Sequence, residues 1–200
     1  MKPLNILIAS VGGQGGLTLA RVLATSAVLQ GLSVRTSESL GMAQRYGSVV
    51  GYIRIGEEIY SPIFEPGEAD YLLGLELNET LRNLHYVKPS GKIIVADEYR
   101  PSYEMSMASP NITRNEVISE MLSINPNLLV IPARKIALKL GNPRALNMVI
   151  LGVFVGLSGI PRIEYVEKAI SEILTGASAE ISVVAFREGL KFVTKNSLNL

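Results

Sequence analysis

Apolar positions in the first part of the chain form two kinds of pattern. An apolar run rich in branched residues begins at Ile6 and stops at the glycine-rich turn Gly12–Gly16. Beyond this turn, apolar residues from Leu17 to Val28 recur three and four positions apart, which is typical of a helix with one buried face. The order of strand, tight turn and helix predicts the start of a β-α-β unit with a buried strand.

Strands and helices continue to alternate as far as Ile131, and only helical patterns follow from Ala133. Further strands are predicted at residues 32–37, 48–55, 69–75, 92–96 and 127–131, with short ones at 59–61, after a hairpin turn at 56–58, and at 103–107. Further helices are predicted at residues 77–86, 113–122, 142–158, 164–174 and 177–195, with Thr113 and Glu116 as a capping box. We therefore predict one domain over residues 1–200: a three-layer α/β/α Rossmann-like fold with a mixed, mostly parallel sheet and a helical C-terminal flank.

The composition excludes several kinds of chemistry within this chain. The sequence has no cysteine, which removes disulfides, thiolate metal sites, a nucleophilic cysteine and iron–sulfur ligation. The single histidine, His85, rules out a His-rich metal centre. The formal net charge of +1, with acids and bases interspersed, provides no positive surface for nucleic acid or anionic lipid. We therefore expect no metal ligands and no nucleic-acid partner.

The sequence carries no pattern of a signal peptide or of a membrane span. The apolar run behind the N-terminus is short and is interpreted as a strand. The longest apolar stretch, residues 148–160, contains three glycines and a serine and falls short of the ~20 apolar residues that cross a bilayer. We expect a cytoplasmic protein that does not associate with membranes.

The glycine-rich turn is the first candidate for a binding site. Glycines there allow positive φ and a close approach of another group, and the following helix offers free N–H groups and a partial positive charge to an anion. The dinucleotide pattern G-x-G-x-x-G is broken, because Thr18 stands where the third glycine would be. No Lys-Ser or Lys-Thr follows the glycines, so the Walker pattern is missing as well. The residue types alone leave a structural turn and a ligand-contacting turn open.

The segment Glu38–Gly47 is the second candidate. It follows a strand that we expect beside the first one, which would place it at the carboxyl edge of the sheet near the glycine turn. Arg45 could pair with a phosphate or carboxylate, Gln44 could donate or accept a hydrogen bond, and Met42 next to Gly41 offers an adaptable apolar contact. The alternative is a solvated loop whose arginine forms a surface ion pair.

Three polar residues, two after predicted strands and one within a predicted helix, allow two interpretations each. Glu76 and Asp97 follow buried strands, where a carboxylate could accept a hydrogen bond from a ligand or cap the next helix. Asn147 interrupts an apolar helix face, so its amide either bonds a neighbouring backbone or faces a ligand. No Gly-x-Ser-x-Gly elbow occurs and no triad can be assembled, so we assign no catalytic residue.

Four sequence blocks, taken together, resemble a known family. The blocks are Val11–Gly15, Gly41–Val49, Ala69–Glu76 with Leu81-Arg82, and Gly141–Val149 followed by Leu151-Gly152. They resemble the gamma subunit or domain of 2-oxoacid:ferredoxin oxidoreductases, and in particular the beta subunit of the indolepyruvate type. The resemblance spans residues 4 to about 190 in the expected order.

The resemblance implies a subunit of a thiamine-diphosphate enzyme that oxidatively decarboxylates a 2-oxoacid to an acyl-CoA. Because this chain has no cysteine and no Gly-Asp-Gly segment, we expect it to bind none of the cofactors alone. A larger alpha-type subunit would carry thiamine diphosphate, magnesium and the 4Fe-4S clusters, with coenzyme A as co-substrate and ferredoxin as electron acceptor. The candidate residues for contact with a cofactor are Gly12, Gly13, Gln14, Gly15, Gly41, Met42, Gln44, Arg45, Glu76 and Asn147.

Two other interpretations remain open from the sequence. A stand-alone Rossmann-like protein could use the same glycine turn for a flavin or nicotinamide nucleotide, although the missing third glycine argues against it. The absorbance of the purified chain separates the two, because a bound flavin is coloured. The chain could also be an interaction protein without any role in an active site.

Overall fold

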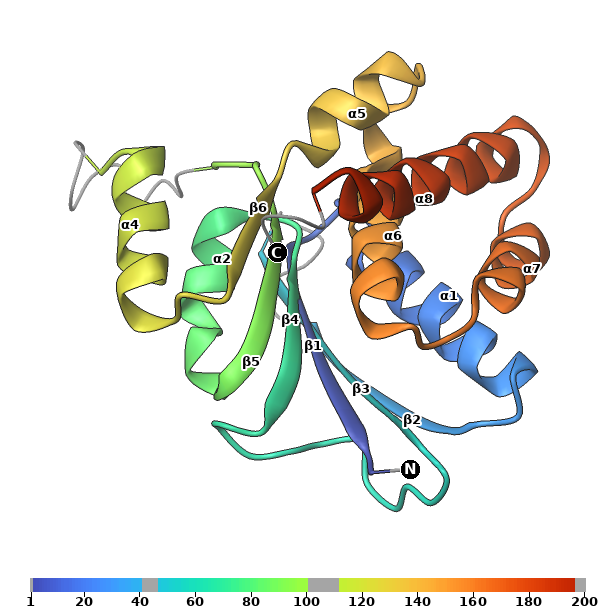
Figure 1. Cartoon of the computed structure of the whole chain (residues 1–200), viewed down its shortest axis with the longest axis horizontal. Helices are drawn as coiled ribbons and strands as arrows, with labels where there is room; N and C mark the ends of the chain where they lie inside the picture. Colours follow the sequence, from blue (N-terminus) through green and yellow to red (C-terminus); the bar gives the residue numbers. More distant parts are fainter. Residues whose placement is uncertain (1, 41–46, 101–111, 197–200) are drawn as a thin grey trace.

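The computed structural model describes residues 2–40, 47–100 and 112–196. Six strands of these ranges form one sheet in the order β2-β3-β1-β4-β5-β6 (Figure 1). The strands are β1 (Leu4–Val11), β2 (Ser33–Leu40), β3 (Ser48–Gly56), β4 (Ala69–Gly74), β5 (Val87–Ala96) and β6 (Leu128–Ile131). The helices are α1 (Gly16–Leu29), α2 (Leu77–Arg82), α4 (Arg114–Ile124), α5 (Ala133–Lys139), α6 (Leu146–Ser158), α7 (Ile163–Ile173) and α8 (Gly176–Asn196), with 3-10 turns η2 (Leu84–Tyr86) and η3 (Pro143–Ala145).

The sheet is mixed and mostly parallel, as the sequence predicts. β1, β4, β5 and β6 pair in parallel, and β3 runs antiparallel to both β1 and β2. The expectation that the second strand lies beside the first is wrong, because β3 lies between them and pairs with both along its whole length. The predicted hairpin into a strand at residues 59–61 is also wrong: these residues are not in a strand. Both edges of β3 are already occupied, so it has no edge left for such a partner.

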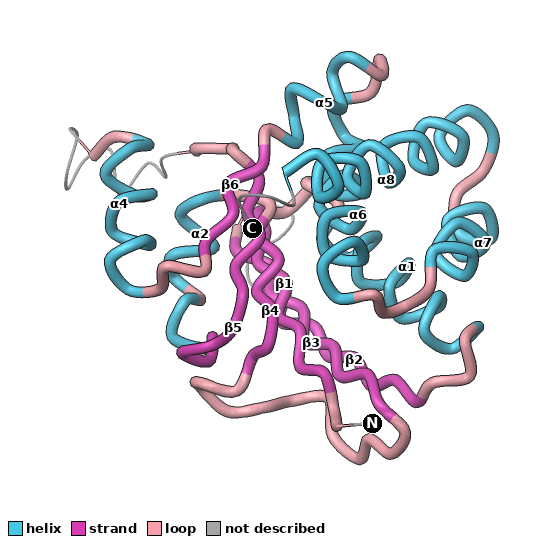
Figure 2. Tube along the Cα trace, in the orientation of Figure 1, coloured by secondary structure: helices cyan, strands magenta, loops and turns pink. Residues whose placement is uncertain are grey.

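Helices cover both faces of the sheet and make three layers. Alternate residues of β1 point to opposite faces, and those between its two end residues are buried: Ile6 and Ile8 pack toward α1, α6, α7 and α8, whereas Leu7 and Ala9 pack toward α2 and α4. Figure 2 shows the same division, with α2 and α4 on one side and the other group opposite. The three-layer prediction is therefore confirmed, and burial on both faces explains the apolar runs of β1 and β4.

The C-terminal helices extend this architecture outward. α6 is almost fully buried, because one of its faces packs on the sheet and another packs against α8. The contact between them is close because Gly152 and Gly189 face each other: a Cβ built on Gly152 would lie 2.0 Å from the carbonyl oxygen of Phe186. The predicted helical flank is present: α8 packs against α6, and α7 packs against α1 (Figure 1).

Local signals in the sequence located several helix ends correctly. The capping box is present, because the Thr113 side chain accepts from the Glu116 N–H and the Glu116 carboxylate accepts from the Thr113 N–H. Asn142 caps η3 through a hydrogen bond from the Arg144 N–H, and α6 follows directly. The helix predicted at 77–86 is divided into α2 and η2, and the strand predicted at 92–96 begins earlier, at Val87. The strand predicted at 103–107 lies outside the described residues.

In the part of the chain that is described, no helix combines the length and apolar character needed to span a bilayer.

Candidate functional site

The glycine turn between β1 and α1 is held in one shape by its own side chains and neighbours. Gly13 and Gly15 have φ of 85° and 84°, the left-handed region that glycine enters most easily. The buried amide of Gln14 accepts from the Val11 N–H at 2.8 Å and donates to the Leu75 carbonyl at 3.1 Å. Gln14 thereby ties the turn to the end of β4, and both atoms of its amide group are engaged within the chain.

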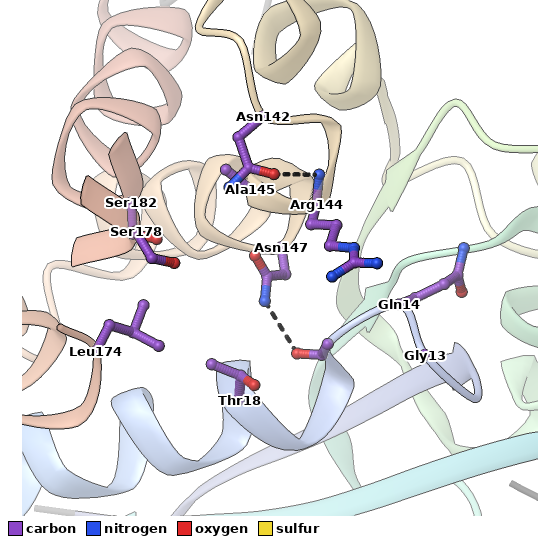
Figure 3. Close-up of a pocket in the computed structure, with 11 residues that line it drawn as sticks. Gly13, Gln14, Thr18, Asn142, Arg144, Ala145, Asn147, Leu174, Ser178 and Ser182 are labelled. Atoms are coloured by element: carbon purple, nitrogen blue, oxygen red, sulfur yellow. Dashed lines mark hydrogen bonds between the residues drawn. The ribbon is translucent and has the colours of Figure 1, made fainter. Parts of the chain in front are cut away.

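Asn147 fixes the same turn from the opposite side. Its Nδ2 donates to the Gly15 carbonyl at 3.0 Å (Figure 3). Its Oδ1 accepts from the Met148 N–H at 2.8 Å. The structural alternative predicted for this amide, a bond to neighbouring backbone, is therefore present. A Cβ on Gly15 would lie only 2.5 Å from Asn147 Nδ2, so this contact depends on a glycine. The first turn of α6 and the first turn of α1 are thus joined at one point.

The end of the second candidate loop meets the glycine turn. The Gly12 N–H donates to the Gly47 carbonyl at 2.9 Å, and Val11 pairs with Ser48 at the end of the β1–β3 ladder. This places the end of segment 38–47 at the carboxyl edge of β1, as expected, although β3 rather than β2 brings it there. Gly41, Met42, Gln44 and Arg45 lie outside the described residues, so their proposed contacts stay predictions.

Glu76 caps α2 and is almost fully buried. Its Oε2 accepts from the Glu79 N–H at 2.8 Å, and its Oε1 accepts from the Arg100 N–H at 2.8 Å. Burial raises the pKa of the Glu76 carboxyl above its ordinary value, and the backbone hydrogen bonds oppose this rise. The capping interpretation is confirmed. The similar prediction for Asp97 has a different outcome, because its carboxylate pairs with the Arg114 guanidinium.

Replacing Glu76 by alanine is expected to lower the free energy of unfolding by about 2 kcal/mol, because two backbone N–H groups lose their buried acceptor. Urea denaturation of the purified variant measures this loss. Glu116→Ala removes a cap carboxylate from an exposed position and is the matched control, with a smaller loss expected. Equal losses in the two variants would contradict a special role for the buried cap.

Three arginines that the sequence patterns did not single out lie together around one cavity. Arg100, Arg134 and Arg144 line a cavity of about 230 Å³ together with Gly13 and Gln14. We call it the arginine cavity; Pro143 and Leu146 complete its lining. The residue pattern contained a usable signal, because Arg100 and Arg134 each follow a parallel strand within four residues of its carboxyl end, at the edge where such sheets bind ligands.

The charge in the arginine cavity is only partly compensated. Glu98, which is 8% exposed, lies 3.7 Å from Arg100 Nη2 and 3.4 Å from Arg134 Nη1 through its Oε2. Arg144 forms no ion pair with any residue that the structure describes. Three guanidinium groups therefore face one carboxylate, an arrangement that attracts an anion such as a phosphate chain.

A second cavity of about 230 Å³ lies next to the first, on the α8 side of the glycine turn (Figure 3). Gly13, Gln14 and Arg144 line both cavities. The other residues that line the second cavity are Gly15, Thr18, Asn142, Ala145, Asn147, Leu174, Ser178 and Ser182.

Within the described ranges, no group of three or more His, Cys, Asp or Glu side chains is placed to hold a metal ion.

These features define a class of protein: a Rossmann-like α/β subunit whose glycine turn and strand ends form an edge suited to anionic groups. The family model of the pyruvate ferredoxin/flavodoxin oxidoreductases matches residues 5–192. The chain therefore belongs to this family and is an oxidoreductase subunit, which confirms the resemblance of the four sequence blocks.

Individual relatives agree with this assignment. The chain is 34% identical over 203 residues to the indolepyruvate oxidoreductase subunit IorB of Pyrococcus horikoshii, with all of both chains covered. A solved gamma subunit of a keto/oxoacid ferredoxin oxidoreductase from Geobacter sulfurreducens has the same fold, with a TM-score of 0.71 at 22% identity over 96% of this chain and 99% of that one. The 2-oxoglutarate:ferredoxin oxidoreductase of Magnetococcus marinus, solved with 2-oxoglutarate, coenzyme A and succinyl-CoA, has a TM-score of 0.74 at 18% identity over 98% of this chain and 32% of that one.

Proposed function

We propose that this chain is the small subunit of an indolepyruvate-type 2-oxoacid:ferredoxin oxidoreductase. In the proposed reaction the bond between the carboxyl and keto carbons of the 2-oxoacid breaks and carbon dioxide leaves. The keto carbon forms a thioester with the sulfur of coenzyme A, the thiol proton is released, and two electrons pass to ferredoxin. The observation that carries the proposal is the full-length similarity to an indolepyruvate oxidoreductase subunit.

The chemistry of the chain supports a division of labour with a larger partner subunit. Iron–sulfur clusters do not fit this chain, because it has no cysteine to ligate them. Thiamine diphosphate, which supplies the means to stabilise the carbanion left by decarboxylation, also finds no Gly-Asp-Gly segment here for its magnesium ion. Both groups would belong to the partner subunit. Ferredoxin would then receive its electrons from the partner.

Coenzyme A is the one group that the described residues fit. Its phosphates are multiply charged, and the arginine cavity presents three guanidinium groups against one carboxylate at the edge of the sheet. In this proposal Arg134 and Arg100 hold the phosphate chain while Glu98 keeps the two guanidinium groups apart and oriented. Gly13, at φ 85°, leaves room for the close approach of a phosphate to the backbone.

Reconstitution with a larger subunit that carries thiamine diphosphate and the iron–sulfur clusters tests the proposal. The complex is expected to reduce ferredoxin with indolepyruvate and coenzyme A, and each subunit alone is expected to be inactive and this chain colourless. Turnover by the isolated chain, or a tightly bound flavin in it, would overturn the proposal in favour of a stand-alone nucleotide-binding protein.

Arg134→Ala in the same complex is expected to raise the KM for coenzyme A about tenfold, because one charge-assisted pair with phosphate is lost. The kcat is expected to change little, since no reacting atom is placed at the arginine cavity. Arg187→Ala is the matched control, because Arg187 pairs with Glu167 on the far helices and does not line the cavity. An unchanged KM in Arg134→Ala would remove coenzyme A from the arginine cavity.

A further inference from the structure

The second cavity is separate from the proposed coenzyme A site and has a different chemistry. Its hydroxyl groups come from Thr18 on α1 and from Ser178 and Ser182 on α8, and its amides come from Asn142 and Asn147 (Figure 3). We call it the serine cavity. None of the described residues that line the serine cavity is acidic. Arg144 is the one charged residue among them.

Three helices begin at the serine cavity. Thr18, Asn147 and Ser178 lie in the first turns of α1, α6 and α8, which begin at Gly16, Leu146 and Gly176. A helix start carries unpaired N–H groups and a partial positive charge that acidic side chains normally offset. None of these three first turns contains an acidic residue, and the N-cap residues of α1 and α6 provide no side-chain hydrogen bond. The positive ends of three helices therefore lie around one cavity without a carboxylate.

Ser182 supplies an independent sign that this cavity takes a ligand. The residue is only 4% exposed, yet its hydroxyl makes no hydrogen bond to any residue of the described ranges. The hydroxyl oxygen is not enclosed by protein but opens into the cavity, where it has a hydrogen bond left to make. Ser178, one helical turn earlier, lies on the same face of α8 and lines the same cavity.

We propose that the serine cavity binds a single phosphate group. A phosphate presents oxygens in four directions, and the cavity presents donors from several: the hydroxyls of Thr18, Ser178 and Ser182 and the guanidinium of Arg144. Backbone N–H groups at the three helix starts add to these donors. The phosphate is either free or part of a larger cofactor, and the experiment below separates these sources.

Titration of the purified full-length chain with inorganic phosphate at constant ionic strength tests the proposal. Phosphate is expected to raise the melting temperature of the chain, and calorimetry is expected to show a site that Arg134→Ala leaves in place. Ser178→Asp places a carboxylate in the first turn of α8 at an exposed position, where it interacts favourably with the helix start. This variant is expected to melt at a higher temperature than the natural chain without phosphate and to bind phosphate at least about tenfold more weakly.

Two controls keep the outcome specific. Ser123→Asp adds the same charge to exposed α4 on the opposite face of the sheet and is expected to leave phosphate binding unchanged. Arg134→Ala disrupts the arginine cavity alone and is likewise expected to leave it unchanged, so this proposal and the coenzyme A site can fail separately. Ser182→Ala is expected to weaken binding about fivefold through the loss of one hydroxyl donor.

Competition identifies the source of the phosphate. If coenzyme A displaces inorganic phosphate and dephospho-coenzyme A does not, the serine cavity holds the 3′-phosphate of that cofactor. If neither displaces it, the ligand is free phosphate or a small phosphate monoester. The proposal is overturned if phosphate does not stabilise the natural chain, if Ser178→Asp binds phosphate as well as the natural chain does, or if Arg134→Ala abolishes binding.

Discussion

Replacing Gly152 by alanine is expected to lower the free energy of unfolding by about 3 kcal/mol, the upper part of the range for an overpacked core. The added Cβ would lie 2.0 Å from the Phe186 carbonyl oxygen and 2.9 Å from the Gly189 Cα, both of them backbone atoms. No side chain can rotate to relieve this contact, so α8 must move away from α6. Denaturation in urea, followed by circular dichroism, measures the loss.

Gly156→Ala on the same helix is the matched control. There the new Cβ would meet the Val193 side chain at 3.0 Å, which can adjust by a few tenths of an ångström. The higher helix propensity of alanine, about 1 kcal/mol over glycine, offsets this adjustment. Gly156→Ala is therefore expected to be near neutral. If Gly152→Ala is equally neutral, the α6–α8 contact is looser than the backbone distances indicate.

Replacing Gly15 by alanine is expected to lower the free energy of unfolding by about 3 kcal/mol and to disturb both cavities beside the glycine turn. A φ of 84° costs an alanine roughly 1–2 kcal/mol. The new Cβ would also displace Asn147 Nδ2, which is 2.5 Å away, and break its bond to the Gly15 carbonyl. Thermal and urea denaturation measure the stability, and the phosphate titration measures the effect on the serine cavity.

Gly67→Ala separates the two contributions. Gly67 has a similar φ of 79°, but no atom lies within 4 Å of the position that a Cβ would take there, so only the backbone strain remains. A loss of roughly 1–2 kcal/mol is expected for this variant. If Gly15→Ala and Gly67→Ala are equally destabilised, Asn147 does not hold the glycine turn in the way that its hydrogen bonds suggest.

The elements of the fold were predictable where the signal is local. Buried strands, the glycine turn after β1 and the capping box at Thr113 each depend on residues within a few positions of one another, and each is present. The order of the strands was not predictable in this way. β3 reverses direction and inserts between β1 and β2, a pairing of segments about 40 residues apart that leaves no mark in the local pattern.

The candidate site shows the same limit. The glycine turn, Gln14 and Asn147 do come together, although the sequence could not show that the two amides are engaged with backbone rather than free. The sequence did not predict the arginine cavity, because Arg100 and Arg134 follow different parallel strands and Arg144 lies in η3, and only the folded chain brings them to one edge. The spacing of these three arginines along the chain does not predict that they lie together.

The insertion of β3 between β1 and β2 also determines in what order the sheet can assemble. β2 has no contact with β1 in the ladder and gains its sheet hydrogen bonds only from β3, which comes later in the chain. A nascent chain that ends before Ser48 therefore cannot complete this edge of the sheet, however well β1 and α1 have formed. Pairing β3 with β1 requires Ser48 to return beside Val11, a contact over more than 35 residues whose loop-closure entropy must be overcome first. The edge of the sheet that contains β2 therefore forms only after β3 has been synthesised.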